Sequence, residues 1–273
     1  MEIVLLGTAA AEAWPAPFCR CDACQEARRR GGKSIRTRSG ALIDSSVKVD
    51  FGPDTSSQMQ REGRDLWAVT TLIFTHGHDD HFTPAELQYR KPMFVAGDLP
   101  ATLHVYGSAE VMDALRAAYV DAEEIGAEFH APLTPLAPVV TSDGTEILPL
   151  PATHVPGTLL LRLTRNGKSV FYGHDTGEIP EETVRALSGS PLDLAIFDCT
   201  YGATDHESVV HMGLAAVVRT IERLRKVGAV TDKTRLMGTH ISHHSGLLHE
   251  PLEERLRPHG IDLAYDGLTI ILE

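Results

Sequence analysis

Residues 69–81 read VTTLIFTHGHDDH, an apolar segment followed at once by three histidines and two aspartates. The apolar part predicts a short buried strand with the polar residues at its end. His76 and His78 are two apart on an extended segment, while Asp80 and His81 project from the turn that follows. Imidazole and carboxylate groups favour borderline divalent ions such as Zn, Mn or Fe over Ca or Mg. The stretch therefore predicts a metal site suited to hydrolysis, rather than a merely polar, histidine-rich loop.

Three more candidate ligands follow apolar strands elsewhere in the chain, namely His154, Asp175 and His240. Each of them alone is weak evidence, but their recurrence at strand ends favours a shared site. Two ions about 3.5 to 4 Å apart need a bridging carboxylate, for which Asp175 is the best candidate. The predicted arrangement places Asp175 and a hydroxide between two ions, one held by His76, His78 and His154 and the other by Asp80, His81 and His240. Asp79 is expected to face solvent or to lie behind the ligands.

Length and composition limit the remaining possibilities. The 273 residues are 42% hydrophobic and 23% charged, which predicts one domain spanning residues 1–273. The net charge of -12 disfavours nucleic acid as a partner, because binding to nucleic acid depends on neutralised phosphates. No signal peptide and no segment of membrane-spanning length is found, so we expect a cytoplasmic protein without a membrane partner. A small phosphorylated substrate is compatible with the charge, and a homodimer is left open.

The hydrophobic pattern alternates between strands and helices without a tandem repeat. Helices are predicted at residues 84–89, 108–119, 180–187 and 208–227. Residues 131–138, with three prolines, predict an extended connector. Strands are predicted at residues 3–7, 40–44, 47–51, 72–75, 103–106, 146–150, 159–164, 169–173, 192–198, 235–238 and 262–272. This pattern favours an α/β fold in which two sheets pack together with helices outside.

The motif at residues 76–81, together with His154, Asp175 and His240, resembles the metallo-beta-lactamase fold hydrolases over almost the whole chain. The resemblance implies a four-layer αββα sandwich of two packed mixed sheets, with a binuclear metal centre at the sheet edges. It does not select a substrate, because this superfamily hydrolyses lactams, thioesters, lactones, phosphodiesters and RNA.

Three cysteines lie within six residues, at Cys19, Cys21 and Cys24. They favour a metal site in a reducing compartment over a disulfide framework, although three free thiols are the alternative. A tetrahedral zinc needs a fourth ligand, which residues 239–244 (THISHH) offer. The arrangement resembles the phosphoribosyl cyclic phosphate phosphodiesterases of phosphonate metabolism. That resemblance implies a structural zinc held by Cys19, Cys21, Cys24 and His243, with His244 and His249 as less suitable substitutes; Cys199 is expected to be a core residue.

The same resemblance assigns His211 to the neighbourhood of the scissile phosphate, where it would protonate the leaving alkoxide; a surface histidine at the start of a helix is the alternative. Proton donation of this kind is worth roughly 10²- to 10⁴-fold in rate. The predicted catalytic residues are thus His211, Asp80 and Asp175, with two Mn, Zn or Fe ions. One departure concerns residues 8–15, TAAAEAWP, where relatives carry a glycine-rich loop. Glu12 brings negative charge there and leaves the specificity open.

The function predicted from these residues is metal-dependent hydrolysis of a cyclic phosphodiester of a ribosyl phosphate or nucleotide. Three rivals remain. A tRNA 3'-processing nuclease shares the metal ligands but needs a basic tRNA-gripping surface that the sequence lacks. A lactonase, thioesterase or lactamase is compatible with the fold, whereas the cysteine loop and His211 argue against it. A non-catalytic binding protein of the quinone-cofactor biosynthesis type has a similar cysteine loop, but such proteins typically lose the histidines that this chain retains.

Overall fold

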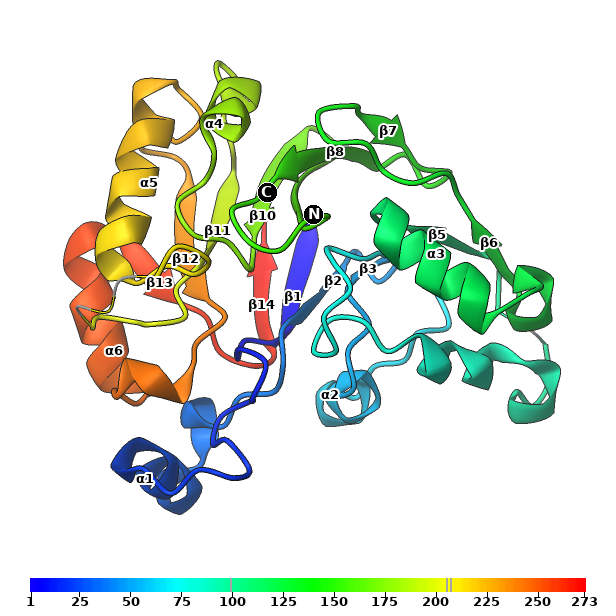
Figure 1. Ribbon diagram of the computed structural model, residues 1–273, viewed down its shortest axis with the longest axis horizontal. Helices are drawn as coiled ribbons and strands as arrows, with labels where there is room; N and C mark the ends of the chain where they lie inside the picture. Colours follow the sequence, from blue (N-terminus) through cyan, green and yellow to red (C-terminus); the bar gives the residue numbers. More distant parts are fainter. Residues whose placement is uncertain (99, 205, 207) are drawn as a thin grey trace.

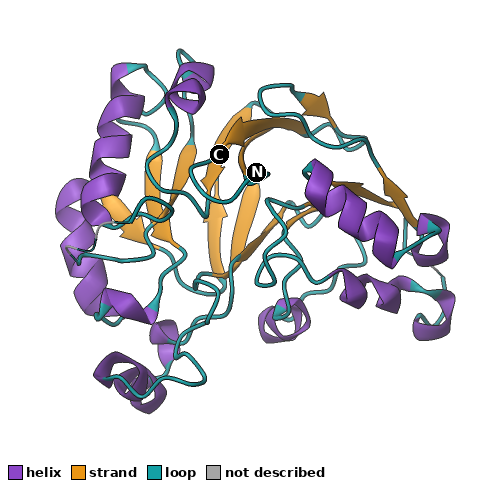
Figure 2. Cartoon of the chain, viewed as in Figure 1, coloured by secondary structure: helices purple, strands orange, loops and turns teal. Residues whose placement is uncertain are grey.

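The computed structural model describes residues 1–98, 100–204, 206 and 208–273, which form two seven-stranded sheets packed together (Figures 1 and 2). The strands of the first sheet are β1 (Glu2–Gly7), β2 (Gly40–Ile43), β3 (Val47–Val49), β4 (Thr71–Ile73), β5 (Leu103–Tyr106), β6 (Ala127–Phe129) and β14 (Leu268–Ile271). Their order is β14-β1-β2-β3-β4-β5-β6. Pairing is antiparallel from β14 to β3 and parallel from β3 to β6.

The second sheet is mixed in the same way. Its strands are β7 (Val139–Val140), β8 (Glu146–Pro151), β9 (Leu159–Arg165), β10 (Lys168–Gly173), β11 (Leu194–Asp198), β12 (Arg235–Thr239) and β13 (Ile261–Leu263). They lie in the order β13-β12-β11-β10-β9-β8-β7. Strands β10 to β13 are parallel, and β7 to β10 are antiparallel.

Helices cover the outer face of each sheet (Figure 2). The α-helices are α1 (Asp22–Arg30), α2 (Thr55–Glu62), α3 (Ala109–Ala118), α4 (Glu181–Leu187), α5 (Leu214–Lys226) and α6 (His249–Leu256). Short 3₁₀ helices lie at Gly32–Ser34, Pro84–Arg90, Pro92–Phe94, Ala122–Ile125, His243–Ser245 and Arg257–His259. The cluster of apolar side chains outside the first sheet includes residues of α2 and α3, and the cluster outside the second sheet includes residues of α1, α4, α5 and α6.

The alternation of side chains along each strand creates these layers. In β1, Ile3 and Leu5 face the other sheet, whereas Val4 and Leu6 face the helices. Because both faces of the strand are buried, its sequence is a continuous apolar run and not an alternating one. A third apolar cluster fills the space between the sheets. The result is the four-layer αββα sandwich, which confirms the predicted fold class.

Some predicted elements differ in the structure. The helix predicted at 208–227 is α5 and begins only at Leu214, because the backbone N–H groups of His211 and Met212 bond to Ser208 and Asp198 instead of continuing a helix. The strand predicted at 262–272 is broken by the turn at Gly267, which has φ +84°, so β13 and β14 join different sheets. The helix predicted at 84–89 is present as a 3₁₀ helix over Pro84–Arg90 and not as an α-helix. Helices α1, α2 and α6 were not predicted, since they are short and expose much of their surface.

The register of the parallel strands brings the metal-binding candidates to one edge. Gly173 pairs with Phe197, which in turn pairs with Gly238. Residues shortly after these positions therefore emerge side by side from β10, β11 and β12. In the first sheet, Val49 pairs with Ile73, so the ends of β3 and β4 are level as well. Among the described residues, no helix combines the length and the apolar composition needed to cross a bilayer.

Candidate metal centre

The histidines and acids predicted as metal ligands converge in space. Three groups with ligand atoms within 4.8 Å of one another are His76–His78–His154, Asp80–His81–His240 and His76–His81–Asp175. Asp175 links the two halves, because its Oδ2 lies 2.8 Å from His81 Nε2 and its Oδ1 lies 4.0 Å from His154 Nε2. On the other side, His154 Nε2 lies 3.3 Å from His78 Nδ1. Asp79 is exposed and outside these groups.

The backbone at this edge is held in an unusual conformation. Asp50, Asp175 and His240 follow β3, β10 and β12, and have φ values of 49° to 61°. Non-glycine residues rarely adopt this left-handed region, at a cost of order 1 kcal/mol or more for each residue. Such strain persists where the surrounding structure enforces it, and here it turns all three side chains at the ends of their strands.

Asp50 orients the histidines of the first sheet. Its buried carboxylate accepts hydrogen bonds from His81 Nδ1 at 2.7 Å, from the Thr75 backbone N–H at 2.8 Å and from Thr75 Oγ1 at 3.0 Å. Because the Thr75 hydroxyl donates to Asp50, it accepts from His76 Nδ1 at 3.1 Å. In the neutral form of each ring the proton is thus on Nδ1 and Nε2 can bind a metal ion, which is the tautomer that a metal ligand needs.

Asp198 and Thr200 orient His240 in the second sheet in the same way. The Thr200 hydroxyl donates to Asp198 Oδ1 at 2.8 Å and accepts from His240 Nδ1 at 2.9 Å. In the neutral ring this again places the proton on Nδ1 and leaves His240 Nε2 available to a metal ion. His154 is oriented by the backbone, since its Nδ1 donates to the Val210 carbonyl at 3.2 Å. Partners behind the ligands therefore fix four of the five histidines in the ligand set.

Buried atoms without hydrogen-bond partners show whether these histidines and acids fit metal ions. Among the described residues, His76 Nε2, His81 Nε2, His240 Nε2 and Asp175 Oδ2 are buried without a hydrogen-bond partner. Buried polar atoms are normally paired, so several unpaired ligand atoms that face one another indicate a cluster suited to cations rather than poor packing. The separations of 2.8 to 3.3 Å between neighbouring donors suit ligands that share an ion. The residues fit a pair of divalent transition-metal ions.

The electrostatics of the cluster also favour positive charge. Burial opposes a charge on His81, yet Asp175, Asp50 and Asp80 outweigh it and raise its pKa well above the usual value. Burial likewise opposes a charge on His240, but the neighbouring Asp175 and Asp80 raise its pKa to about 9. The carboxylates thus create a field that attracts cations, and divalent ions compete with protons for the same atoms.

His211 lies at the rim of this cluster and not on a helix. Its Nδ1 donates to Asp198 Oδ2 at 2.8 Å, and its ring is 4.9 Å from that of His154 and 5.4 Å from that of His240. Asp198 is fully buried and also accepts from the Thr176, Thr200 and Met212 backbone N–H groups, which hold it rigidly. The alternative of an isolated surface histidine does not describe this contact.

The cysteine loop meets His243 at a separate place. The Sγ atoms of Cys19 and Cys21 lie 3.7 and 3.6 Å from His243 Nδ1, and Cys24 completes a group within 4.8 Å. Zn–S and Zn–N bonds of about 2.3 and 2.1 Å put tetrahedral S and N ligands about 3.6 Å apart. The four residues therefore fit a tetrahedral zinc. Cys21 Sγ also caps α1 by accepting from the Cys24 N–H.

Residues 8–15, where relatives carry a glycine-rich loop, contact the site formed by the cysteines and His243. Glu12 accepts a hydrogen bond from Ser242 Oγ, and its Oε1 lies 3.7 Å from His243 Nε2. The added carboxylate therefore lies behind the candidate zinc ligand. His244 contributes its ring beside His243 but is not part of the group, and His249 instead contacts Arg36. Cys199 is a buried core residue, as expected.

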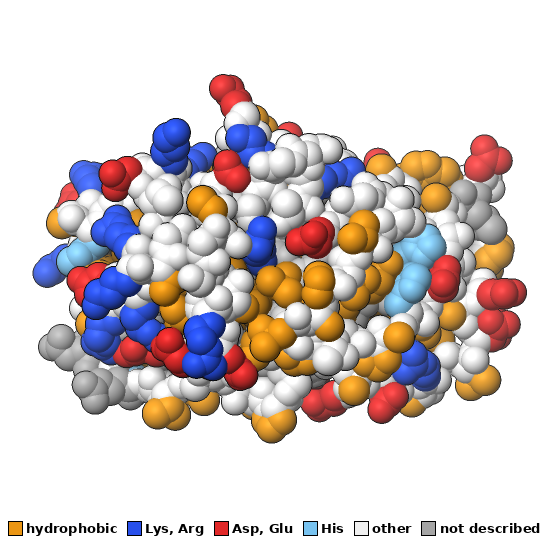
Figure 3. Space-filling model, turned by 90° about the horizontal axis from the view of Figure 1, so that it is seen from above, with side chains coloured by type: hydrophobic (Ala, Val, Ile, Leu, Met, Phe, Trp, Pro, Cys, Tyr) orange, Lys and Arg blue, Asp and Glu red, His pale blue; other side chains and the backbone are white. Residues whose placement is uncertain are grey.

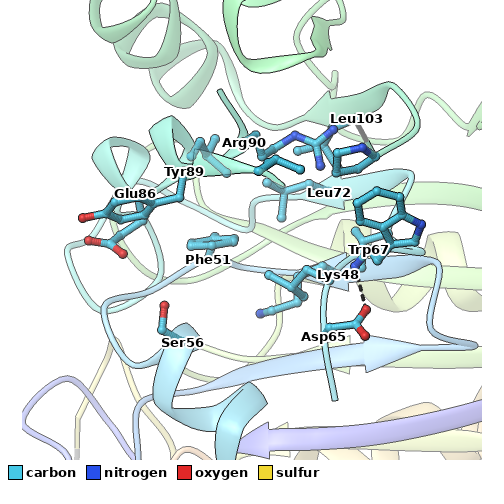
Figure 4. Close-up of a pocket in the computed structure, with 15 residues that line it drawn as sticks. Lys48, Phe51, Ser56, Asp65, Trp67, Leu72, Glu86, Tyr89, Arg90 and Leu103 are labelled. Atoms are coloured by element: carbon cyan, nitrogen blue, oxygen red, sulfur yellow. Dashed lines mark hydrogen bonds between the residues drawn. The ribbon is translucent and has the colours of Figure 1, made fainter. Parts of the chain in front are cut away.

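Two cavities differ in where they lie relative to His211 and the candidate metal ligands. A polar cavity of about 600 Å³ is bounded by His211 and by Thr204, Ser208, Glu178 and Arg219, among others. A mostly apolar cavity of about 470 Å³ lies on the outer side of the first sheet, lined by Phe51, Trp67 and Tyr89 among others (Figure 4). Among the described residues, no candidate metal ligand lines either cavity. Of the two, the polar cavity is the one that borders the predicted catalytic residue His211.

A family model described as a beta-lactamase superfamily domain matches residues 42–241. The chain belongs to the beta-lactamase superfamily. This superfamily member is 26% identical over 318 residues to coenzyme PQQ synthesis protein B of Cupriavidus necator, with 99% of both chains covered. A diphosphatase of the PhnP family has a TM-score of 0.78 and 24% identity, covering 100% of this chain and 98% of that one. Zinc-bound PqqB from Methylobacterium extorquens also has a TM-score of 0.78, with 17% identity and full coverage of both chains.

Sequence reasoning missed the residues behind the ligands, namely Asp50, Thr75, Asp198 and Thr200. Asp198 carried a signal, since it ends an apolar run just as Asp175 follows one. Asp50 also follows an apolar strand, but nothing in its sequence neighbourhood points to a histidine 31 residues away. The superfamily fold accounts for the pairing, because β3 and β4 are adjacent and parallel.

Proposed function

We propose that this superfamily member is a binuclear-metal-dependent phosphodiesterase that opens a cyclic phosphate of a ribosyl phosphate or nucleotide. The observation that carries the proposal is the His211–Asp198 pair beside the candidate metal ligands, at 2.8 Å. A thiolate leaves a thioester without being protonated, whereas the alkoxide that leaves an alkyl phosphodiester needs a proton from an acid. The retained histidines support a catalytic role.

The residues that would hold the ions are those of the two convergent groups. His76, His78 and His154 would bind one ion, and Asp80, His81 and His240 the other, with Asp175 shared between them. Two divalent cations bound there supply positive charge for the phosphate oxygens and lower the pKa of a water molecule. A structural zinc on Cys19, Cys21, Cys24 and His243 would tie the N-terminal loop to the segment that carries His240.

His211 would supply the proton that the leaving alkoxide needs. Hydrolysis forms a bond from a water oxygen to phosphorus and breaks the bond from phosphorus to the alcohol oxygen, which leaves as an alkoxide. Because Asp198 accepts from Nδ1, Asp198 stabilises the charged imidazolium, and Nε2 is the atom that can deliver a proton to the departing oxygen. Asp198 is a positioning residue here, since it acts through His211.

The cavity beside His211 supports a compact, polar substrate. Its volume of about 600 Å³ lies within the usual range for small-molecule sites. Hydroxyl groups of Thr204 and Ser208 and the guanidinium of Arg219 line it, which suits a phosphorylated sugar. Arg219 is paired with Glu178 at 2.8 Å, so the cavity is not strongly basic, and this disfavours a long RNA substrate.

The leaving group distinguishes this mechanism from its rivals. We expect metal-loaded protein to hydrolyse ribosyl or nucleotide cyclic phosphates and bis-p-nitrophenyl phosphate. His211→Ala should lower kcat for the cyclic phosphates by about 10²- to 10⁴-fold, but should change hydrolysis of the nitrophenyl ester little, because nitrophenolate leaves without a proton. His259→Ala, which removes an exposed histidine after α6, is the matched control. The proposal fails if fully metallated protein cleaves nitrocefin, lactones or thioesters but no diester of the panel.

A role in coenzyme PQQ synthesis is the second candidate, and the similarity to proteins of that name over nearly the whole chain favours it. Its test is genetic: the gene should restore coenzyme formation in a strain that lacks protein B of that pathway. Complementation by His211→Ala as efficiently as by the wild type, with no diesterase activity in vitro, would favour this role over the phosphodiesterase.

A further inference from the structure

Two histidines and a glutamate converge on a part of the first sheet that the metal centre does not use. His104 on β5 and Glu128 on β6 are direct partners in the parallel pair. His130 follows two residues after Glu128, and its backbone N–H continues the ladder by donating to the Val105 carbonyl at 3.1 Å. Alternation along the strands therefore places all three side chains on one face of the sheet edge.

The separations between the polar atoms suit a shared cation. His104 Nδ1 lies 3.0 Å from His130 Nε2 and 3.3 Å from Glu128 Oε2. Metal–ligand bonds of about 2.1 Å separate neighbouring ligands by about 3.0 Å in an octahedron and by about 3.4 Å in a tetrahedron. Glu128 Oε1 also lies 3.9 Å from His130 Nδ1, the ring nitrogen that faces away from His104.

The three side chains are held in place yet open to solvent. The Tyr106 ring stacks on the His130 ring at 4.4 Å with an angle of 2° between their planes, which fixes its orientation. The side chains of His104 and His130 are 21% and 28% exposed, so an ion can enter and water can complete its shell. Partial burial lowers the pKa of His130, which favours the neutral form of the ring that can bind a metal ion. Figure 3 shows histidine side chains gathered at the surface beside an acidic one, on the side of the molecule that carries β5 and β6 in Figure 1.

We propose that His104, Glu128 and His130 bind a divalent transition-metal ion of the zinc class, at a site separate from the two clusters described above. The separation follows from the register: His104 pairs with Thr71 at the start of β4, whereas His76 follows the end of that strand. Two imidazoles and one carboxylate are the donor set that suits Zn, Ni or Cu ions rather than Ca or Mg. The ion ties β6, a three-residue strand at the edge of the sheet, to its neighbour β5.

The test is a zinc titration of protein that is already loaded with zinc and freed of excess metal, so that the tighter clusters are filled. Isothermal titration calorimetry should then detect one further equivalent of Zn²⁺ in the wild type. His130→Gln should weaken this binding about tenfold or more, while His259→Gln, an exposed histidine elsewhere, should leave it unchanged. Cu²⁺ at the same site should give an EPR spectrum with imidazole nitrogen couplings that His130→Gln reduces.

A second variant, Glu128→Gln, controls for the possibility that His130→Gln does not fold. Glu128→Gln removes only an oxygen donor from a side chain that is 58% exposed, so it should fold normally and also weaken the binding. If the loaded wild type takes up no further zinc, or if both variants bind it as tightly as the wild type does, the cluster is only a hydrogen-bonded histidine pair and the proposal is wrong. Diesterase activity is not part of this test, so the outcome is independent of the proposed function.

Discussion

The most informative substitution is Asp50→Asn, because this carboxylate is the one on which two candidate metal ligands depend. The Asp50 carboxylate accepts a hydrogen bond from His81 Nδ1 at 2.7 Å, and it orients His76 through the Thr75 hydroxyl. An asparagine that keeps its oxygen toward the Thr75 N–H must turn its NH₂ group toward His81 Nδ1. His81 Nδ1 then has to accept a hydrogen bond from this NH₂ group. The ring proton of His81 therefore moves to Nε2, which is the atom that faces the cluster.

The magnitude follows from the number of ligands affected. Loss of one partner behind a metal ligand costs about 10- to 100-fold in metal affinity, or about 1.4 to 2.7 kcal/mol. Because Asp50 supports one histidine in each of the two convergent groups, we expect the upper end of this range and weakened binding of both ions. Affinity is measured by competition with a chromophoric chelator, and stoichiometry by elemental analysis.

Asp79→Asn is the matched control, since it removes an exposed carboxylate from the same motif and should leave both ions bound as before. Circular dichroism must show that Asp50→Asn is folded. A folded Asp50→Asn protein that retains both ions at unchanged affinity would refute the reasoning, because the tautomers of His76 and His81 would then be set by something other than this carboxylate.

Three further predictions concern other parts of the chain. Asp198→Asn should lower kcat for cyclic phosphates more than for nitrophenyl esters, because Asp198 acts through His211 on the alkoxide leaving group and, through Thr200 and His240, on metal binding for both substrates; equal loss on both substrates would contradict the part that acts through His211. Glu12→Gln should speed zinc release from the cysteine site, followed with a chelating dye, because Glu12 faces His243; an unchanged release rate would argue against that contact. Lys48 is fully buried, and burial lowers its pKa to about 8, although Asp50 partly offsets this. The folded chain therefore loses the Lys48 proton at a lower pH than the unfolded chain does, so the stability of the wild type relative to Lys48→Met should rise between about pH 8 and 10.5. The rise should be of order 3 kcal/mol in total, measured by urea unfolding at several pH values. A relative stability that stays flat or falls over this window would contradict a lowered pKa of the Lys48 amine.

The fold could be predicted because its strands are local and strongly apolar. Residues such as 3–7 and 169–173 form β-structure with both faces buried, and their sequences show it directly. The ligand candidates were equally visible, since each histidine or acid follows such a run. Short helices such as α2 were not, because their stability comes from packing on a sheet and not from their own sequence.

The sequence by itself determined the chemical types of the site: imidazoles and carboxylates at strand ends, and three thiols in one loop. The tertiary structure decided which polar residue stands behind which ligand. Asp50 meets His81 because β3 and β4 are parallel neighbours, and Asp198 meets His211 because residues 208–212 bend back onto β11 before α5 begins. It also brought His104, Glu128 and His130 together. Such pairs depend on strand order and register, which arise from burial of the whole sheets and leave no local trace in the chain.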